Sequence, residues 1–87
     1  MTSRTVCVSN YGDDVPAVSA RFVQKACEFK SSVLIEIDNK RYVNGKSFMG
    51  MLSLGVREGM QLHIMSDGAD EELAVETLGS FFGKITA

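Results

Sequence analysis

The stretch "NGKSFMGMLSLG", residues 44–55, contains the signals for both ends of a short helix. Ser47 can cap the N-terminus, because a serine hydroxyl accepts a hydrogen bond from a backbone N–H of the first turn. Gly55 stands where a helix commonly ends in a left-handed residue. These signals predict a helix from Ser47 through Leu54. Soft apolar side chains surround the serine in this segment: Phe48, Met49, Met51 and Leu52.

Two strands are expected before this helix. The segment "SSVLIEID" (31–38) has a β-branched residue at every second position from 33 to 37, which is typical of a strand buried on one face. The segment "RYVN" (41–44) resumes the extended pattern after polar residues that suit a turn. The pair is predicted to be a β-hairpin.

A strand and a helix are expected after it. The segment "GMQLHIMS" (59–66) alternates, with Leu62 and Ile64 on one face of the predicted strand. The segment "ADEELAVETLGSFFGKITA" (69–87) predicts a helix, because its three early acids suit the positive end of a helix dipole. Its predicted buried stripe consists of Leu73, Leu78, Phe81, Phe82 and Ile85.

The N-terminal part of the chain predicts one more strand and one more helix. "RTVCVS" (4–9) alternates like a half-buried strand, and "NYGDD" (10–14) is rich in turn formers. Pro16 follows at a position suited to the first turn of a helix, which is expected to begin at Val15. Its apolar residues recur at helical spacing: Val18, Phe22, Val23, Ala26 and Phe29.

The predicted order is strand, helix, strand, strand, helix, strand, helix. It favours an α+β fold in which helices cover one face of a single sheet and the other face meets water. With 87 residues and no linker or repeat, one domain is expected over 1–87. The open face is predicted to carry Cys7, Leu34, His63 and Met65.

Composition argues against several classes of partner. Nine Lys and Arg against eleven Asp and Glu give a net charge of −2, which disfavours direct binding to nucleic acid. No apolar run approaches the roughly 20 residues of a membrane helix. The start of the chain has neither the apolar stretch nor the cleavage site of a signal peptide, so a cytoplasmic location is expected.

The sequence carries no motif for nucleotides or metals and predicts neither a cofactor nor an enzyme. His63 is the only histidine and lies mid-strand without an acidic neighbour in sequence. Cys7 and Cys27 are not spaced as a metal pair and are interpreted as small apolar residues. Asp13 and Asp14 are interpreted as helix capping residues. The acids between 67 and 72 lack the spacing of a calcium loop and are expected to form a solvated helix start.

Three segments in register resemble HPr, the histidine-containing phosphocarrier of the bacterial sugar phosphotransferase system. They are "ARFVQKACEF" (20–29), "VNGKSFMGMLSLG" (43–55) and "GADEELAVETL" (68–78). The resemblance extends along essentially the whole chain. It implies the fold of that family, an open-faced β-sandwich with a four-stranded antiparallel sheet and three helices on one side.

The resemblance fails at the phosphocarrier site. The family places a histidine in a segment of the form GLHxRP just before the first helix. In "GDDVPAVSARF" (12–22) an ungapped alignment puts Val15 at the histidine and Ala17 at the arginine that follows it. Shifted registers place Asp14 or Asp13 there, and no register supplies a histidine. The chain is therefore predicted not to be a competent histidine phosphocarrier.

Ser47 matches the serine that Gram-positive relatives present to the HPr kinase/phosphorylase. In the family the phosphorylated serine is read by the transcriptional regulator catabolite control protein A, so the resemblance implies protein partners of these two kinds. The residues it implies at the contact surface are Phe48, Met51 and Leu52, with Lys46 beside the serine and Ala20, Arg21 and Gln24 on the first helix.

Three functions follow from these observations. The first is a regulatory protein similar to the catabolite-repression HPr proteins, which lack the histidine and keep the serine. The second is an interaction module of the same fold in which Ser47 is only a helix cap. The third is a carrier that uses Asp13 or Asp14. The sequence does not assign an oligomeric state.

Overall fold

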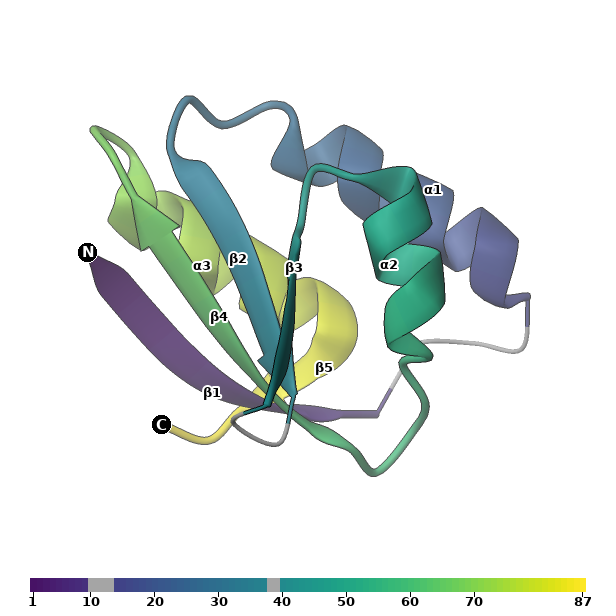
Figure 1. Cartoon of the computed structure of the whole chain (residues 1–87). Coiled ribbons are helices and arrows are strands. Elements are labelled where there is room, and N and C mark those ends of the chain that lie inside the picture. The colour runs from purple at the N-terminus through teal and green to yellow at the C-terminus, as the bar shows by residue number, and fades with distance from the viewer. Residues whose placement is uncertain (10–13, 38–39) are drawn as a thin grey trace.

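The computed structural model describes residues 1–9, 14–37 and 40–87. Three helices lie on one face of a five-stranded antiparallel sheet with strand order β3-β2-β4-β1-β5 (Figure 1). The elements are β1 (Thr2–Val8), α1 (Val15–Ala26), β2 (Ser32–Ile37), β3 (Arg41–Asn44), α2 (Phe48–Leu54), β4 (Gln61–Asp67), α3 (Glu71–Phe82) and β5 (Gly83–Ile85). This confirms the predicted α+β architecture and adds one strand to the expected four.

The alternating residues of the strands form the sheet side of the core. Val6 pairs with Leu62 across β1 and β4, and Ile35 pairs with Ile64 across β2 and β4; all four are fully buried. Their neighbours on the other face are half-buried, which confirms the predicted open face: Cys7, Leu34, His63 and Met65.

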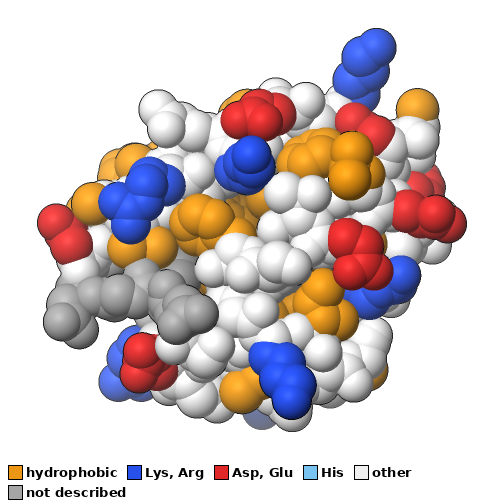
Figure 2. Space-filling view, turned by 180° about the vertical axis from the view of Figure 1, so that it is seen from behind, with side chains coloured by type: hydrophobic (Ala, Val, Ile, Leu, Met, Phe, Trp, Pro, Cys, Tyr) orange, Lys and Arg blue, Asp and Glu red, His pale blue; other side chains and the backbone are white. Residues whose placement is uncertain are grey.

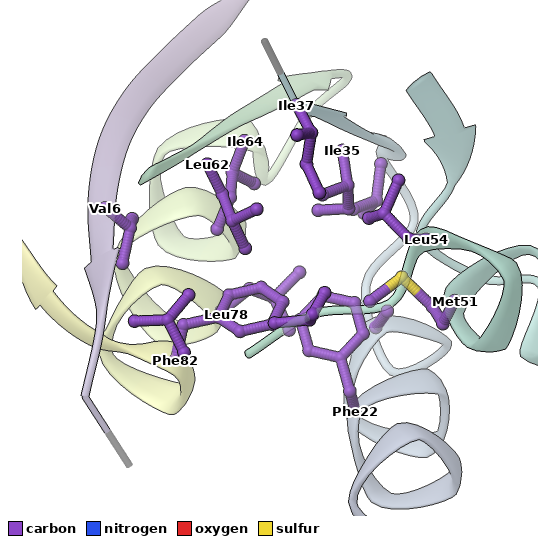
Figure 3. Close-up of a cluster of buried hydrophobic side chains, with 14 of the residues drawn as sticks. Val6, Phe22, Ile35, Ile37, Met51, Leu54, Leu62, Ile64, Leu78 and Phe82 are labelled. Carbon is purple, nitrogen blue, oxygen red and sulfur yellow. The ribbon is translucent and has the colours of Figure 1, made fainter. Parts of the chain in front are cut away.

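Aromatic side chains from the helices complete the core. Phe22 of α1 and Phe82 of α3 lie with ring centroids 4.7 Å apart, beneath the aliphatic side chains of the sheet (Figure 3). Met51 and Leu54 enter the same cluster from α2. Each of the three helices therefore supplies side chains to one continuous core.

Charged side chains are dispersed over the face of the molecule that Figure 2 shows. In the view from behind Figure 1, Lys and Arg side chains are separated from one another and interspersed with acids and small apolar areas (Figure 2). This view shows no continuous basic field of the kind that binds nucleic acid. Among the described residues, no helix is long and apolar enough to cross a membrane.

Local signals placed most elements within one or two residues of their observed ends. Pro16 lies in the first turn of α1, and Gly55 ends α2 with φ 68°. The predicted hairpin forms from β2 and β3, although positions 38 and 39 of its turn lie outside the described residues.

The prediction for the C-terminal segment was wrong in three respects. Leu73 is 63% exposed, and the helix ends at Phe82, so that Ile85 lies in β5 instead. The buried stripe is Ala74, Val75, Leu78, Gly79 and Phe82. The fifth strand is held to β1 by antiparallel pairing and by a bond from the Thr86 N–H to the Thr5 carbonyl, 2.8 Å. A three-residue strand is too short to show its own periodicity.

Asp70 is also not the solvated residue that the acidic run suggested. It makes no side-chain cap bond to α3. Its carboxylate instead accepts hydrogen bonds from the Ser31 hydroxyl and from the backbone N–H groups of Lys30 and Ser31, the last two at 2.9 Å. These bonds, led by that of the Ser31 hydroxyl, lower the pKa of Asp70 from 3.8 to about 2. Asp70 thereby joins the start of α3 to the start of β2.

We predict that Asp70→Asn lowers the urea midpoint at neutral pH. Because the folded pKa is depressed, the stabilisation is present above the ordinary pKa of 3.8 and is lost as the pH falls through about 2. The difference in stability between the wild type and the variant should therefore shrink as the pH falls from 3.8 and vanish near pH 2. Asp67→Asn, at an exposed residue, is the control; an equal loss from both variants would contradict this role for Asp70.

Candidate functional site

Ser47 is the N-cap of α2. Its backbone is extended, with φ −105° and ψ 116°, and its half-buried hydroxyl Oγ accepts a hydrogen bond from the Gly50 N–H at 3.1 Å. The Ser47 carbonyl accepts the Met51 N–H at 2.9 Å. In the described residues, the N–H groups of Phe48 and Met49 donate to no protein acceptor. The hydroxyl therefore lies beside two free donors at the positive end of the helix.

The turn before Ser47 is firmly held. Asn44 accepts the Ser47 N–H through its carbonyl at 3.0 Å and the Lys46 N–H through its Oδ1 at 2.9 Å. The Lys46 ammonium donates to the Phe29 carbonyl at 2.8 Å, just beyond α1. Lys46 therefore links the start of α2 to the segment after α1.

Three apolar side chains next to Ser47 reach the surface. Met49 is 70% exposed, Phe48 is 38% exposed, and Leu52 is half-buried. We call these three residues the α2 patch. Their exposure provides a soft apolar surface beside the serine hydroxyl, which suits an adaptable protein contact.

Met51 does not belong to this surface, so its placement there was wrong. Its side chain is fully buried and points into the core with Leu54, three residues further along the helix (Figure 3). Residues three apart lie on the same helix face, so Met51 and Leu54 form the core stripe of α2. Met49 lies on the exposed side. The three-residue spacing between Met51 and Leu54 was the sequence signal for a buried Met51. It could have assigned Met49, in place of Met51, to the surface.

The three predicted contact residues of α1 are all exposed. Gln24 lies four residues after Ala20 and three after Arg21, so it shares a side of the helix with each of them. Helix α1 packs against α2 (Figure 1). The two helices therefore form one layer that carries both sets of candidate contacts.

The segment before α1 provides a cap. Asp14 is exposed, and its carboxylate accepts the Ala17 N–H at 3.3 Å as the N-cap of the helix. Val15 is the first residue of α1, and Asp13 lies outside the described residues. The carboxylate of Asp14 thus has the helix-capping role that the sequence predicted.

His63 lies away from this segment. It is half-buried in β4, opposite Thr5 of β1, and its Nδ1 is 3.0 Å from the Thr5 Oγ1. The two cysteines are unpaired. Across residues 1–9, 14–37 and 40–87, no three His, Cys, Asp or Glu side chains gather in a way that could hold a metal ion.

Comparison with known proteins assigns the family. The family described as the PTS HPr component phosphorylation site matches residues 3–84. The chain belongs to the HPr family. HPr-like proteins of the phosphotransferase system and of catabolite repression are its relatives, and proteins of this family act through protein partners.

Two curated HPr-like relatives and one solved HPr structure illustrate the match. The chain is 42% identical to the HPr-like protein Crh of Halalkalibacterium halodurans over 66 residues, which cover 76% of this chain and 77% of the relative. It is 43% identical to the HPr-like protein Crh of Bacillus subtilis over 63 residues, 72% and 73% of the two chains. The crystal structure of an HPr from Thermoanaerobacter tengcongensis superposes on the present structure with a TM-score of 0.83 at 38% identity. The match covers 97% of the present chain and 98% of the Thermoanaerobacter tengcongensis chain.

Proposed function

We propose that the protein is a regulatory HPr-like protein that is switched by phosphorylation of Ser47 and does not carry phosphate on histidine. The observation that carries this proposal is the position of the Ser47 hydroxyl, at the N-terminus of α2 and beside the exposed α2 patch. A modification at this point changes charge next to a surface that a partner can contact.

The local geometry supports a phosphate on this serine. The free N–H groups of Phe48 and Met49 and the dipole of α2 stabilise negative charge at the helix start. A phosphate oxygen can replace Oγ as the acceptor of the Gly50 N–H. Phosphorylation adds a charge of about −1.5 to −2 at neutral pH without burying it. The fold should therefore tolerate the modification, and a partner should detect it.

Histidine phosphotransfer has little support in this chain. Its single histidine is in β4, in contact with Thr5, and the family's histidine position aligns with Val15 or, in shifted registers, with Asp14 or Asp13. An acyl phosphate on Asp14 would have to replace its cap bond to Ala17. We therefore expect no stable phosphate after incubation with phosphoenolpyruvate and the first enzyme of the phosphotransferase system.

The proposed partners follow from the family resemblance. An HPr kinase/phosphorylase would modify Ser47, and a regulator similar to catabolite control protein A would bind the modified form. In this role the protein is a cytoplasmic binding protein and not an enzyme. The contact surface would consist of the α2 patch with Ala20, Arg21 and Gln24 of α1, which are all exposed.

A second function, an interaction module without phosphorylation, is favoured by the bond between Ser47 and Gly50. That bond accounts for a serine at this position by capping alone. In that case Ser47→Ala would cost about 1 kcal/mol of stability and leave partner binding unchanged.

Intact mass after incubation with HPr kinase and ATP separates the two functions. We predict one phosphate on the wild type and none on Ser47→Ala. Ser53→Ala is the matched control, because Ser53 is an exposed serine of the same helix whose hydroxyl donates to the Gly50 carbonyl at 2.8 Å. It should still accept one phosphate. An unmodified wild type would favour the interaction module, and a phosphate retained on Ser47→Ala would place the modification elsewhere.

A further inference from the structure

A groove lies between β3 and the last turn of α2 and continues past the end of the helix. It consists of two adjoining hollows with volumes of about 700 and 520 Å³. Both are lined by Lys40, Arg41, Ser53 and Leu54, so they form one continuous surface feature. We call it the β3 groove. It reaches the C-terminal end of α2, whereas Ser47 lies at the N-terminal end.

The β3 groove combines positive charge with an apolar floor. Lys40, Arg41 and Arg57 are exposed and line it, and no described lining residue is acidic. Glu36 and Glu58 are not among the lining residues, and Asp38, next to Ile37 in sequence, lies outside the described residues. The floor is made of aliphatic and thioether side chains: Ile37, Leu54, Val56 and Met60.

The cations are available to a ligand. The Arg41 Nη2 donates to the Leu54 carbonyl at 2.8 Å, which holds the guanidinium at the rim of the groove. Within the described ranges, none of Lys40, Arg41 and Arg57 forms an ion pair. Three positive charges in a protein of net charge −2 therefore converge on one groove without a described counter-charge.

The groove also lies along an unpaired sheet edge. Strand β3 is the edge strand, with β2 as its only neighbour in the sheet. The bond from the Gly45 N–H to the Val33 carbonyl, 2.9 Å, sets the hydrogen-bonding alternation of this pair. Hydrogen-bonded pairs alternate with pairs that are not hydrogen-bonded, and Tyr42 and Glu36 form a pair of the second kind. The backbone N–H and C=O of Tyr42 therefore point to the outer edge of the sheet. Tyr42 also lines the groove. Edge strands with free backbone groups bind extended peptides by strand addition.

We propose that the β3 groove binds an extended segment of a protein partner in which carboxylate and apolar side chains alternate. The segment pairs with the backbone of Tyr42, places its apolar side chains on the floor, and sets its carboxylates against Lys40, Arg41 and Arg57. The site is separate from Ser47 and does not depend on its phosphorylation, so it provides a second contact for a partner.

Fluorescence anisotropy with a labelled hexapeptide of alternating glutamate and valine tests the charge recognition. Arg57→Glu should weaken binding about tenfold, because it reverses a charge on the groove. Lys84→Glu is the matched control, since Lys84 is an exposed residue of β5 at the opposite edge of the sheet. It should change the affinity less than about twofold. A peptide with lysine in place of glutamate should not bind.

Amide hydrogen exchange with the same peptide tests the strand pairing. Exchange at the Tyr42 N–H should slow when the peptide is bound, and exchange in β5 should not change. Equal weakening by Arg57→Glu and Lys84→Glu would overturn the proposal, as would unchanged exchange at Tyr42. Displacement of the peptide by inorganic phosphate, or self-association of the protein through β3, would also overturn the assignment to a partner peptide.

Discussion

Met51→Ala is expected to lower the free energy of unfolding by about 2–5 kcal/mol, because it opens a cavity in the core. Met51 is fully buried and lies in the same cluster as Phe22 and Leu54 (Figure 3). Met49→Ala removes the same side chain two residues earlier in the same helix. Because Met49 is 70% exposed, its loss should change the free energy by less than about 0.5 kcal/mol.

Urea unfolding of the two variants measures this difference directly. The midpoint should fall for Met51→Ala and stay near the wild-type value for Met49→Ala, with the slope unchanged in both. Because the two substitutions are chemically identical and have the same helix propensity change, the comparison isolates burial. Similar midpoints for the two variants would contradict the observed orientation of α2.

Met49→Ala is expected to weaken binding of the Ser47-phosphorylated protein to the proposed regulator about tenfold or more. A few side chains that become fully buried near the centre of an interface account for losses of this size. Met49 is the most exposed member of the α2 patch, and its own backbone N–H is one of the two free donors at the start of the helix. Its truncation removes contact area without disturbing the core.

Leu73→Ala provides the control for this effect. Leu73 is a large apolar residue with 63% exposure, close to that of Met49, but it lies on α3 and outside the proposed contact surface. Titration calorimetry should give wild-type affinity for Leu73→Ala. Equal losses for the two variants would mean that the regulator recognises general apolar exposure and not the α2 patch.

The elements that sequence predicted well are those with strong local signals. Ser47 and Gly55 marked both ends of α2, and the alternation from 33 to 37 marked β2, because capping and strand periodicity depend on neighbouring residues. The assignments of core faces in β1, β2 and β4 followed for the same reason.

The features that sequence missed depend on contacts between distant segments. Asp70 bonds to Ser31 across 39 positions, and β5 forms only because β1 offers it an edge. Leu73 matched an apolar pattern but lies off the stripe that packing selects, which runs through Ala74 and Leu78.

The candidate site shows the same division. Ser47 and its role as a cap were readable from the sequence, and Phe48 and Leu52 were placed correctly at or near the surface. Met51 was assigned to the surface although its spacing from Leu54 indicated the core, and Met49 was left out. Lys46 could not be placed from sequence, since its bond to the Phe29 carbonyl depends on how α1 and α2 pack.

If Ser47 is a switch, its phosphorylation must change the affinity of the partner. The affinity of the proposed regulator is measured for the Ser47-phosphorylated protein and for the unmodified protein, with Ser47→Ala treated identically as the reference. We expect phosphorylation to tighten binding by about 1–3 kcal/mol, through charge-assisted contacts beside the α2 patch. Equal affinities for the modified and unmodified protein would contradict it and leave Ser47 as a helix cap.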